Sequence, residues 1–511
     1  MTMNKNVLLA ALFLFFINLS AQSQVERGVE LLLLEDYEEA KKVFEESAVV
    51  EPDISYYYLG EIELRKGNPD EAMAYYPKGT SVVPEAIFSQ IGTLKIASKA
   101  DRAALDKSLR AISKKNRKKA PVLLAVAQAY YYNNMTKEAA NALSMARSAD
   151  KSYPYIYIFE GDRLEKMGDV GSAATQYEQA INFNPKVAIA YVKNSIVYQS
   201  ISPQVAITTL TAGLEANPGN ELIGRYLARN YYKSGFYERA IETYNNLDRS
   251  RLQAEDARNY AASLYFSNKY PEALAALNEI YAKTPDQPVI NRLLMYTHDK
   301  LQNNDEVIAA GKRFFSLPIK NDEGRYLIAD YTIYAAALMA DNQVDEALKV
   351  YQKAAELDPN EVAPIYKEVA LMLANADRLT DAGDFYRRYI DATESADASD
   401  YLQLGIYYYQ AAGQLSKKIN AAEKASSEGG TAGSTPSANV SQLRDTLGQT
   451  VSKATEAFGK VIESTPDSYQ GYYWRANANT LLDPDLSKGL ANNDYLKMIE
   501  LLTANGDTDN Q

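Results

Sequence analysis

PYIYIFEGDRLEKMGDVGSAATQYEQAINFNPKV, residues 154–187, is the stretch that decides the fold. Apolar residues recur three and four positions apart on both sides of Gly168, which is the pattern of two short amphipathic helices joined by a turn. Two small residues, Gly161 and Ala173, lie twelve positions apart. We expect them where the two helices cross, because only small side chains let helix backbones approach closely. The ring of Tyr177 should then fill the space beside them.

The same spacing returns along the chain every 32 to 35 residues, with one step of 40. One helix pair cannot bury its apolar face alone, so the units must stack on one another. The pattern therefore predicts an all-α solenoid. The spaced pairs are Gly28/Ala40, Gly60/Ala72, Gly92/Ala104, Ala127/Ala139, Gly161/Ala173, Asn194/Ala206, Ala228/Ala240, Ala261/Ala273, Met295/Val307, Ala335/Ala347 and Ala370/Ala382.

This repeat resembles the tetratricopeptide repeat (TPR) family, with the best matches at residues 154–187 and 53–86. The resemblance covers about residues 22–500 and implies a right-handed superhelix of about 12–13 helix pairs. Eleven units occupy residues 22–396, and an insertion near 317–324 suggests a hinge. The ninth unit departs from the pattern, because Gly311 stands where a large residue is expected. We expect looser packing there.

The twelfth unit, residues 397–466, carries an insertion. Gly405 should be followed by its small partner at position 417, but the matching sequence appears at Ala454, 37 residues later. The sequence predicts two lengthened helices that form a hairpin with a disordered tip at 426–437. The insertion is either a tolerated surface feature or a dedicated docking arm.

The two ends of the chain differ in sequence from the repeats between them. Residues 1–21 combine Lys5, an apolar run and small residues before a cleavage point, which is the pattern of a secretory signal peptide. Residues 467–502 are expected to cap the open end of the stack. The polar tail, 503–511, should be disordered. No other segment is apolar enough to span a membrane.

Composition excludes several classes of function. The 511 residues carry a net charge of −12, which argues against nucleic acid as a partner, and they include no Cys and one His, His298. We find no phosphate loop, nucleophile elbow or metal-ligand spacing. The sequence thus predicts a non-enzymatic protein without a cofactor or metal. The basic run 114–119 is interpreted as a solvated helix end.

The resemblance implies that the first helix of each pair lines a concave groove for peptide segments or partner helices. Groove positions would lie three before, one after and four after the first small residue of each unit. Around 190–300 they hold arginine and tyrosine, which suit an acidic peptide or a terminal carboxylate. The candidate residues are Tyr191, Tyr198, Arg225, Arg229, Tyr232, Arg258, Tyr265, Arg292 and Tyr296.

Two other interpretations of this surface remain open. Its arginines could pair with carboxylates of the same protein on an ordinary solvated face. Alternatively, the tyrosines could stack against sugar rings, which would make the protein a glycan-binding envelope protein. Our first hypothesis is an exported scaffold of the bacterial periplasm or cell envelope. It would bind a protein or peptide and reach the membrane only through a partner.

Overall fold

The computed structural model describes residues 24–83, 85–97, 101–319, 325–357, 362–428 and 438–504. In these residues every regular element is a helix, and all are α-helices except the 3₁₀ helix η1 (Arg249–Arg251). The predicted all-α solenoid of repeated helix pairs is confirmed. None of the described helices is long and apolar enough to cross a membrane. The chain divides into two compact units, one ending at Ser267 and one starting at Asn268.

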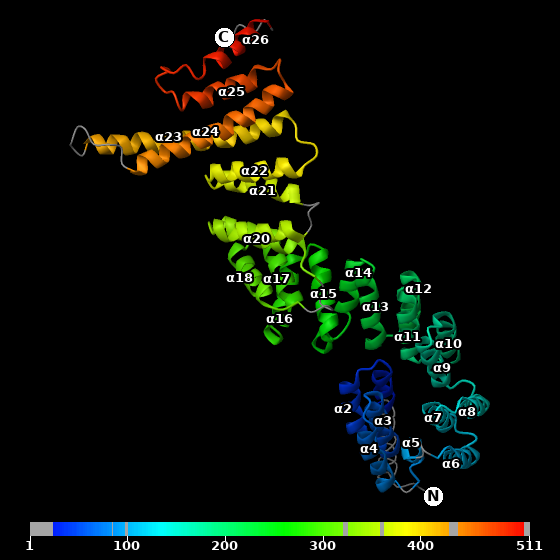
Figure 1. The fold of residues 1–511 in the computed structure, drawn as a ribbon. Coiled ribbons are helices and arrows are strands. Elements are labelled where there is room, and N and C mark those ends of the chain that lie inside the picture. Colours follow the sequence, from blue (N-terminus) through cyan, green and yellow to red (C-terminus); the bar gives the residue numbers. More distant parts are fainter. Residues whose placement is uncertain are drawn as a thin grey trace. The chain divides into compact units, whose positions relative to one another are not determined.

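The first unit begins with a helix over residues 24–33, and each odd-numbered helix that follows is the first helix of a pair (Figure 1). Its helices are α2 (Tyr37–Ser47), α3 (Pro52–Arg65), α4 (Pro69–Val82), α5 (Ile87–Ala97), α6 (Arg102–Lys115), α7 (Ala120–Tyr132), α8 (Thr136–Ala149), α9 (Pro154–Lys166), α10 (Val170–Phe183), α11 (Ala188–Gln199), α12 (Pro203–Ala216), α13 (Glu221–Lys233), α14 (Tyr237–Asn245) and α15 (Ala254–Phe266).

The second unit continues the alternation, and its longest helices, α23 and α24 with 31 and 27 residues, pack along each other as a hairpin (Figure 1). Its helices are α16 (Tyr270–Lys283), α17 (Pro288–Lys300), α18 (Asn304–Ser316), α19 (Ile328–Ala340), α20 (Val344–Leu357), α21 (Val362–Asn375), α22 (Leu379–Ala392), α23 (Ala398–Glu428), α24 (Ala438–Ser464), α25 (Tyr469–Thr480) and α26 (Asn492–Ala504). Four predicted segments lie wholly or largely outside the described residues: 1–21, 320–324 of the hinge, the tip 426–437 and the tail 503–511.

Turns within the helix pairs share one backbone conformation. Gly67 and Gly168, which follow α3 and α9, have φ angles of 86° and 79°. This left-handed conformation ends a helix and is open to glycine at no steric cost. Glu35 adopts it as well, with a φ of 62°, although a Cβ atom makes it unfavourable by roughly 1 kcal/mol. The turn predicted at Gly168 is therefore formed, and Glu35 adopts the same conformation despite its side chain.

The interior is built from small residues against tyrosine rings, as the spacing predicts. A Cβ atom added to Gly161 would lie 2.5 Å from the ring of Tyr177. One added to Gly60 or Gly92 would lie 2.3 or 2.4 Å from the ring of Tyr76. Both rings are fully buried. The Tyr76 ring therefore packs against two successive repeats at once.

The ninth repeat is packed differently from our expectation. A Cβ atom on Gly311 would lie 2.5 Å from the ring of Tyr334, which comes from the next first helix, α19. Tyr334 is buried. The predicted loose packing at Gly311 is wrong, because a large residue from the next repeat fills the space that the glycine leaves.

Candidate functional site

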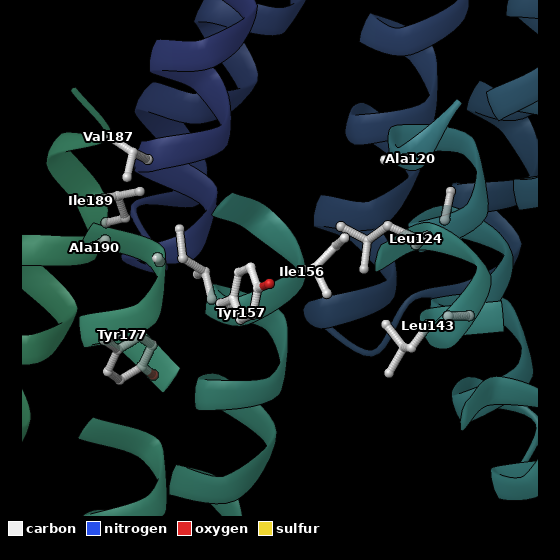
Figure 2. Packing of buried hydrophobic residues seen from close by; sticks show 14 of the residues in the cluster. Ala120, Leu124, Leu143, Ile156, Tyr157, Tyr177, Val187, Ile189 and Ala190 are labelled. Atoms are coloured by element: carbon white, nitrogen blue, oxygen red, sulfur yellow. The ribbon is translucent and has the colours of Figure 1, made fainter. Parts of the chain in front are cut away.

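The first unit closes on itself, because its first repeat contacts its last. The side chain of Gln253, at the start of α15, donates a 2.7 Å hydrogen bond from Nε2 to Asp36 Oδ2. Glu30 lies near the backbone N–H of Ile189 on α11, which acts to lower the pKa of its carboxyl group. The ring of Tyr155 on α9 packs into the cluster around Leu32. Figure 2 shows the N-terminal helices, in blue, beside α9 and α11.

This closure surrounds a cavity of about 820 Å³. Its walls come from the first helices of the first six repeats, namely the helix 24–33 and α3, α5, α7, α9 and α11. A volume of this size accommodates several side chains of a ligand. Eight aromatic residues line it: Tyr57, Tyr58, Phe88, Tyr131, Tyr132, Tyr153, Tyr155 and Phe159.

Two ion pairs in the cavity wall are satisfied within the protein. Lys95 Nζ lies 2.7 Å from Glu61 Oε2, and Lys193 Nζ lies 3.2 Å from Asp162 Oδ1. The hydroxyl of Tyr177 also donates to Asp162, at 2.8 Å. These groups link neighbouring first helices, so they shape the wall and are not free to bind a ligand.

Arg163 is a cavity cation with no ion-pair partner among the described residues. Its guanidinium lies 5.2 Å from the ring centroid of Tyr131, which is a cation–π distance. No described carboxylate lies within ion-pair distance of it, and its buried Nε has no hydrogen-bond partner among the described residues. Only Nη1 makes a long 3.6 Å contact, to the sulfur of Met167. A buried donor of this kind is expected to have a partner, so Arg163 offers a place for a carboxylate or carbonyl of a ligand.

Glu30 lies where the first unit closes. Burial raises the pKa of Glu30 to about 7, and the charge of Glu26 raises it further, against the opposing effects of the Ile189 N–H and Arg27. An acid with a raised pKa in the folded state keeps a proton that the unfolded chain releases. The free energy of unfolding therefore falls as the pH rises from about 4.5 to about 7.

Glu30→Gln is expected to remove this pH dependence. At pH 8 the variant should be more stable by about 2 kcal/mol, after allowance for the partial exposure of the side chain, and near pH 4.5 it should equal the wild type. Thermal unfolding followed by circular dichroism at several pH values measures this. Glu45→Gln, an exposed change on α2, is the control. Parallel stability profiles for wild type and Glu30→Gln would refute the assignment.

The predicted groove residues on α13 are engaged by the protein itself. Arg229 is buried, and it donates hydrogen bonds of 2.5 and 2.8 Å from Nε and Nη2 to the two oxygens of Asp256 on α15. Arg225 Nη1 lies 3.6 Å from the same carboxylate. Burial lowers the pKa of Arg229, but the hydrogen bond and charge of Asp256 outweigh this and raise it overall. Arg229 Nη1 also lies 2.8 Å from Glu255 Oε2, so the two cations are paired with two carboxylates of the protein itself.

In the second unit Arg292 and Tyr296 share a carboxylate in the same way. Arg292 Nη2 donates to Asp330 Oδ2 at 2.9 Å, and the Tyr296 hydroxyl donates to Asp330 Oδ1 at 2.7 Å. Asp330 is fully buried. Asp256 and Asp330 both lie five residues before the small residue of their first helix. This position lies outside the three groove offsets. An acidic residue at this position is the signal that would have revealed the internal pairing.

The remaining candidates have separate surroundings. Tyr191 is 4% exposed, and its ring packs against Gly213, so it lies in the interior and not on an open groove face. Tyr198 donates to Glu178, while Tyr265 packs edge-on against its neighbour Phe266. Arg258 is half-buried and has no described carboxylate within ion-pair distance. Its charge opposes the rise that burial causes in the pKa of Tyr232.

The repeats are similar in sequence to those of known proteins. The model of the tetratricopeptide repeat family matches three stretches, residues 25–78, 227–288 and 335–397. These matches support the resemblance of the repeats to the tetratricopeptide repeat family. The TPR fold suggests a protein–protein interaction scaffold.

Two TPR proteins and one part of a TPR protein illustrate how distant the similarity is. A TPR repeat-containing protein of Methanocaldococcus jannaschii is 29% identical over 160 residues, which are 30% of this chain and 27% of that protein's length. The C-terminal part of a TPR protein from Cytophaga hutchinsonii is 25% identical, with 49% of this chain and 80% of that one covered and a TM-score of 0.30. A tetratricopeptide repeat protein from Parabacteroides merdae is 14% identical, with coverage of 50% and 98% and a TM-score of 0.32.

The cavity follows the positional rule that predicted groove residues further along the repeats. The three offsets from Gly60 give Tyr57, Glu61 and Leu64, and those from Gly161 give Ile158, Asp162 and Glu165. All six line the cavity. The three offsets therefore identify lining residues of the cavity. The predicted groove was placed at 190–300 instead, because arginine is frequent there.

Proposed function

We propose that this chain is an exported, non-enzymatic TPR scaffold that holds a peptide segment of a partner protein in the cavity of its first unit. The observation that carries the proposal is the unpaired Arg163 on the ring of Tyr131, inside an aromatic cavity of about 820 Å³. An arginine on an aromatic platform holds a carboxylate by forked hydrogen bonds.

The ligand segment should combine an apolar or aromatic side chain with a carboxylate, either acidic or C-terminal. The eight aromatic rings provide contact area for the first, and Arg163 provides the charge for the second. The arginines at 225 and 229 are a weaker choice for an acidic peptide, because Asp256 and Glu255 already neutralise them. We therefore place the peptide in the cavity and not along the arginines between 190 and 300.

Arg163→Ala is expected to weaken partner binding about tenfold or more, because a charge-assisted hydrogen bond contributes roughly 1.5–3 kcal/mol. A photo-crosslinking residue at Phe159, in the cavity, identifies the partner and its bound segment by mass spectrometry. Binding of that segment is then measured by calorimetry. Arg251→Ala, an exposed cation paired with Glu221, is the matched control.

The outcome also separates the two classes of ligand. Peptide capture that depends on Arg163 should weaken at high salt. A bound glycan that survives high salt, or unchanged affinity in Arg163→Ala, would contradict the peptide proposal. Export rests on the composition of residues 1–21, and cell fractionation tests it. An uncleaved protein in the cytoplasm would rule export out.

A further inference from the structure

The outer layer of the first unit carries a basic face at α6. Residues 102–119 contain eight basic residues and one acidic residue, in a chain with a net charge of −12. All eight basic side chains are exposed. A solvated helix end accounts for cations in the last turn, but these extend along the whole helix and into the loop after it. The eight are Arg102, Lys107, Arg110, Lys114, Lys115, Arg117, Lys118 and Lys119.

A hollow of about 270 Å³ lies between α6 and α8 on this basic face. Arg110, Lys114 and Arg117 line it from the first side. Arg110 and Lys114 are four residues apart and share one side of α6, and Arg117 lies in the turn that follows the helix. Ala142 and Met145 of α8 provide apolar surface on the other side. The hollow thus combines three cations with an apolar wall that is buried at Ala142 and exposed at Met145.

The cations of the hollow are incompletely neutralised. Arg110 Nε lies 2.7 Å from Asp106 Oδ2, one turn earlier on α6. No described carboxylate lies within ion-pair distance of Lys114 or Arg117. Glu138 of α8 also lines the hollow, and its charge acts on Arg110. The hollow therefore keeps net positive charge and an acidic group that a bound anion would have to approach.

We propose that this hollow binds an acidic peptide segment that carries one apolar side chain. The acidic side chains would pair with Arg110, Lys114 and Arg117, and the apolar side chain would enter beside Ala142 and Met145. A peptide suits the hollow, because a narrow segment can place carboxylates against the cations and one apolar side chain beside Met145, which is 36% exposed, within a volume of about 270 Å³. The hollow lies between second helices, so it is separate from the central cavity and does not depend on the ligand proposed there.

The probe is a short fluorescein-labelled peptide of alternating glutamate and serine with one central leucine. Fluorescence anisotropy with the full chain should show binding that weakens as salt is added. Replacing Arg110, Lys114 and Arg117 together by Gln is expected to weaken it about tenfold. Glu138→Gln should strengthen it about twofold, because it removes the acid that faces the ligand.

The matched control replaces Lys115, Lys118 and Lys119 by Gln. It removes the same charge from neighbouring exposed positions outside the hollow, and affinity should fall at most about twofold. Equal losses in both triple variants would overturn the proposal, since they would show a diffuse field and not a site. It would also be overturned if vesicles with phosphatidylserine, but not the peptide, required the three hollow residues. Replacing the leucine by serine should weaken binding, and no change would exclude the apolar contact.

Discussion

Asp256→Ala is expected to destabilise the first unit by about 3–5 kcal/mol, the largest single effect among the substitutions considered. The Asp256 side chain is fully buried, and it accepts hydrogen bonds from Arg229 and from the hydroxyl of Tyr244. Its removal leaves the guanidinium of Arg229, with 10% of the side chain exposed, with the solvent-exposed Glu255 as its remaining carboxylate partner. Breaking one side of such a pair costs far more than the pair contributes in net terms.

Denaturant unfolding, together with amide hydrogen exchange to locate the change, measures this effect. A double variant, Arg229→Met with Asp256→Leu, should recover most of the lost stability, because it removes both charges. Glu221→Ala breaks the exposed pair with Arg251 and should change stability by less than about 1 kcal/mol. A loss for Asp256→Ala as small as that of Glu221→Ala would show that Arg229 is solvated and that the cluster is unimportant for stability.

Gly161→Val is expected to destabilise the first unit by about 3 kcal/mol. The new Cβ atom would lie 2.5 Å from the ring of Tyr177. That ring is fully buried, and its hydroxyl donates to Asp162 and Glu165. It cannot move away without losing these hydrogen bonds, so the helices α9 and α10 must separate.

Thermal unfolding followed by circular dichroism measures the change in stability. Gly171→Ala is the control, because nothing lies within 4 Å of a Cβ atom at this helical position, and helix propensity predicts a gain of up to about 1 kcal/mol. Shortening the ring with Tyr177→Leu in the Gly161→Val background should restore part of the loss. If Gly161→Val and Gly171→Ala behave alike, the close approach is not a requirement of the fold.

The repeats could be predicted because their determinants are local. The spacing of Gly60, Gly161 and their alanine partners depends on the geometry of one helix pair, and so do the turns at Gly67 and Gly168. The ninth repeat was misjudged because its packing uses Tyr334, which belongs to the next repeat and lies outside the spacing rule. A packing residue can therefore come from the neighbouring repeat, and the repeat spacing does not reveal this.

The candidate site depends on contacts between residues of different repeats, which the repeat spacing does not predict. The hydrogen bond between Asp36 and Gln253 joins residues 217 positions apart, and this closure makes a cavity from what would otherwise be an open groove. The internal pairing of Arg225, Arg229 and Arg292 likewise depends on which carboxylate of the next repeat faces them. Position along a helix predicts which side a residue occupies, but not whether the protein has already provided its partner.

The closure also changes how the first unit comes apart. In an open stack of repeats the terminal repeat touches only one neighbour, so unfolding starts at the ends, where the least contact has to be lost. Here the repeat formed by the helix 24–33 and α2 rests on α3 and also on α9, α11 and the start of α15. Fraying at that end must break two interfaces in one step. Opening at that end should therefore be rarer than in an open stack of repeats.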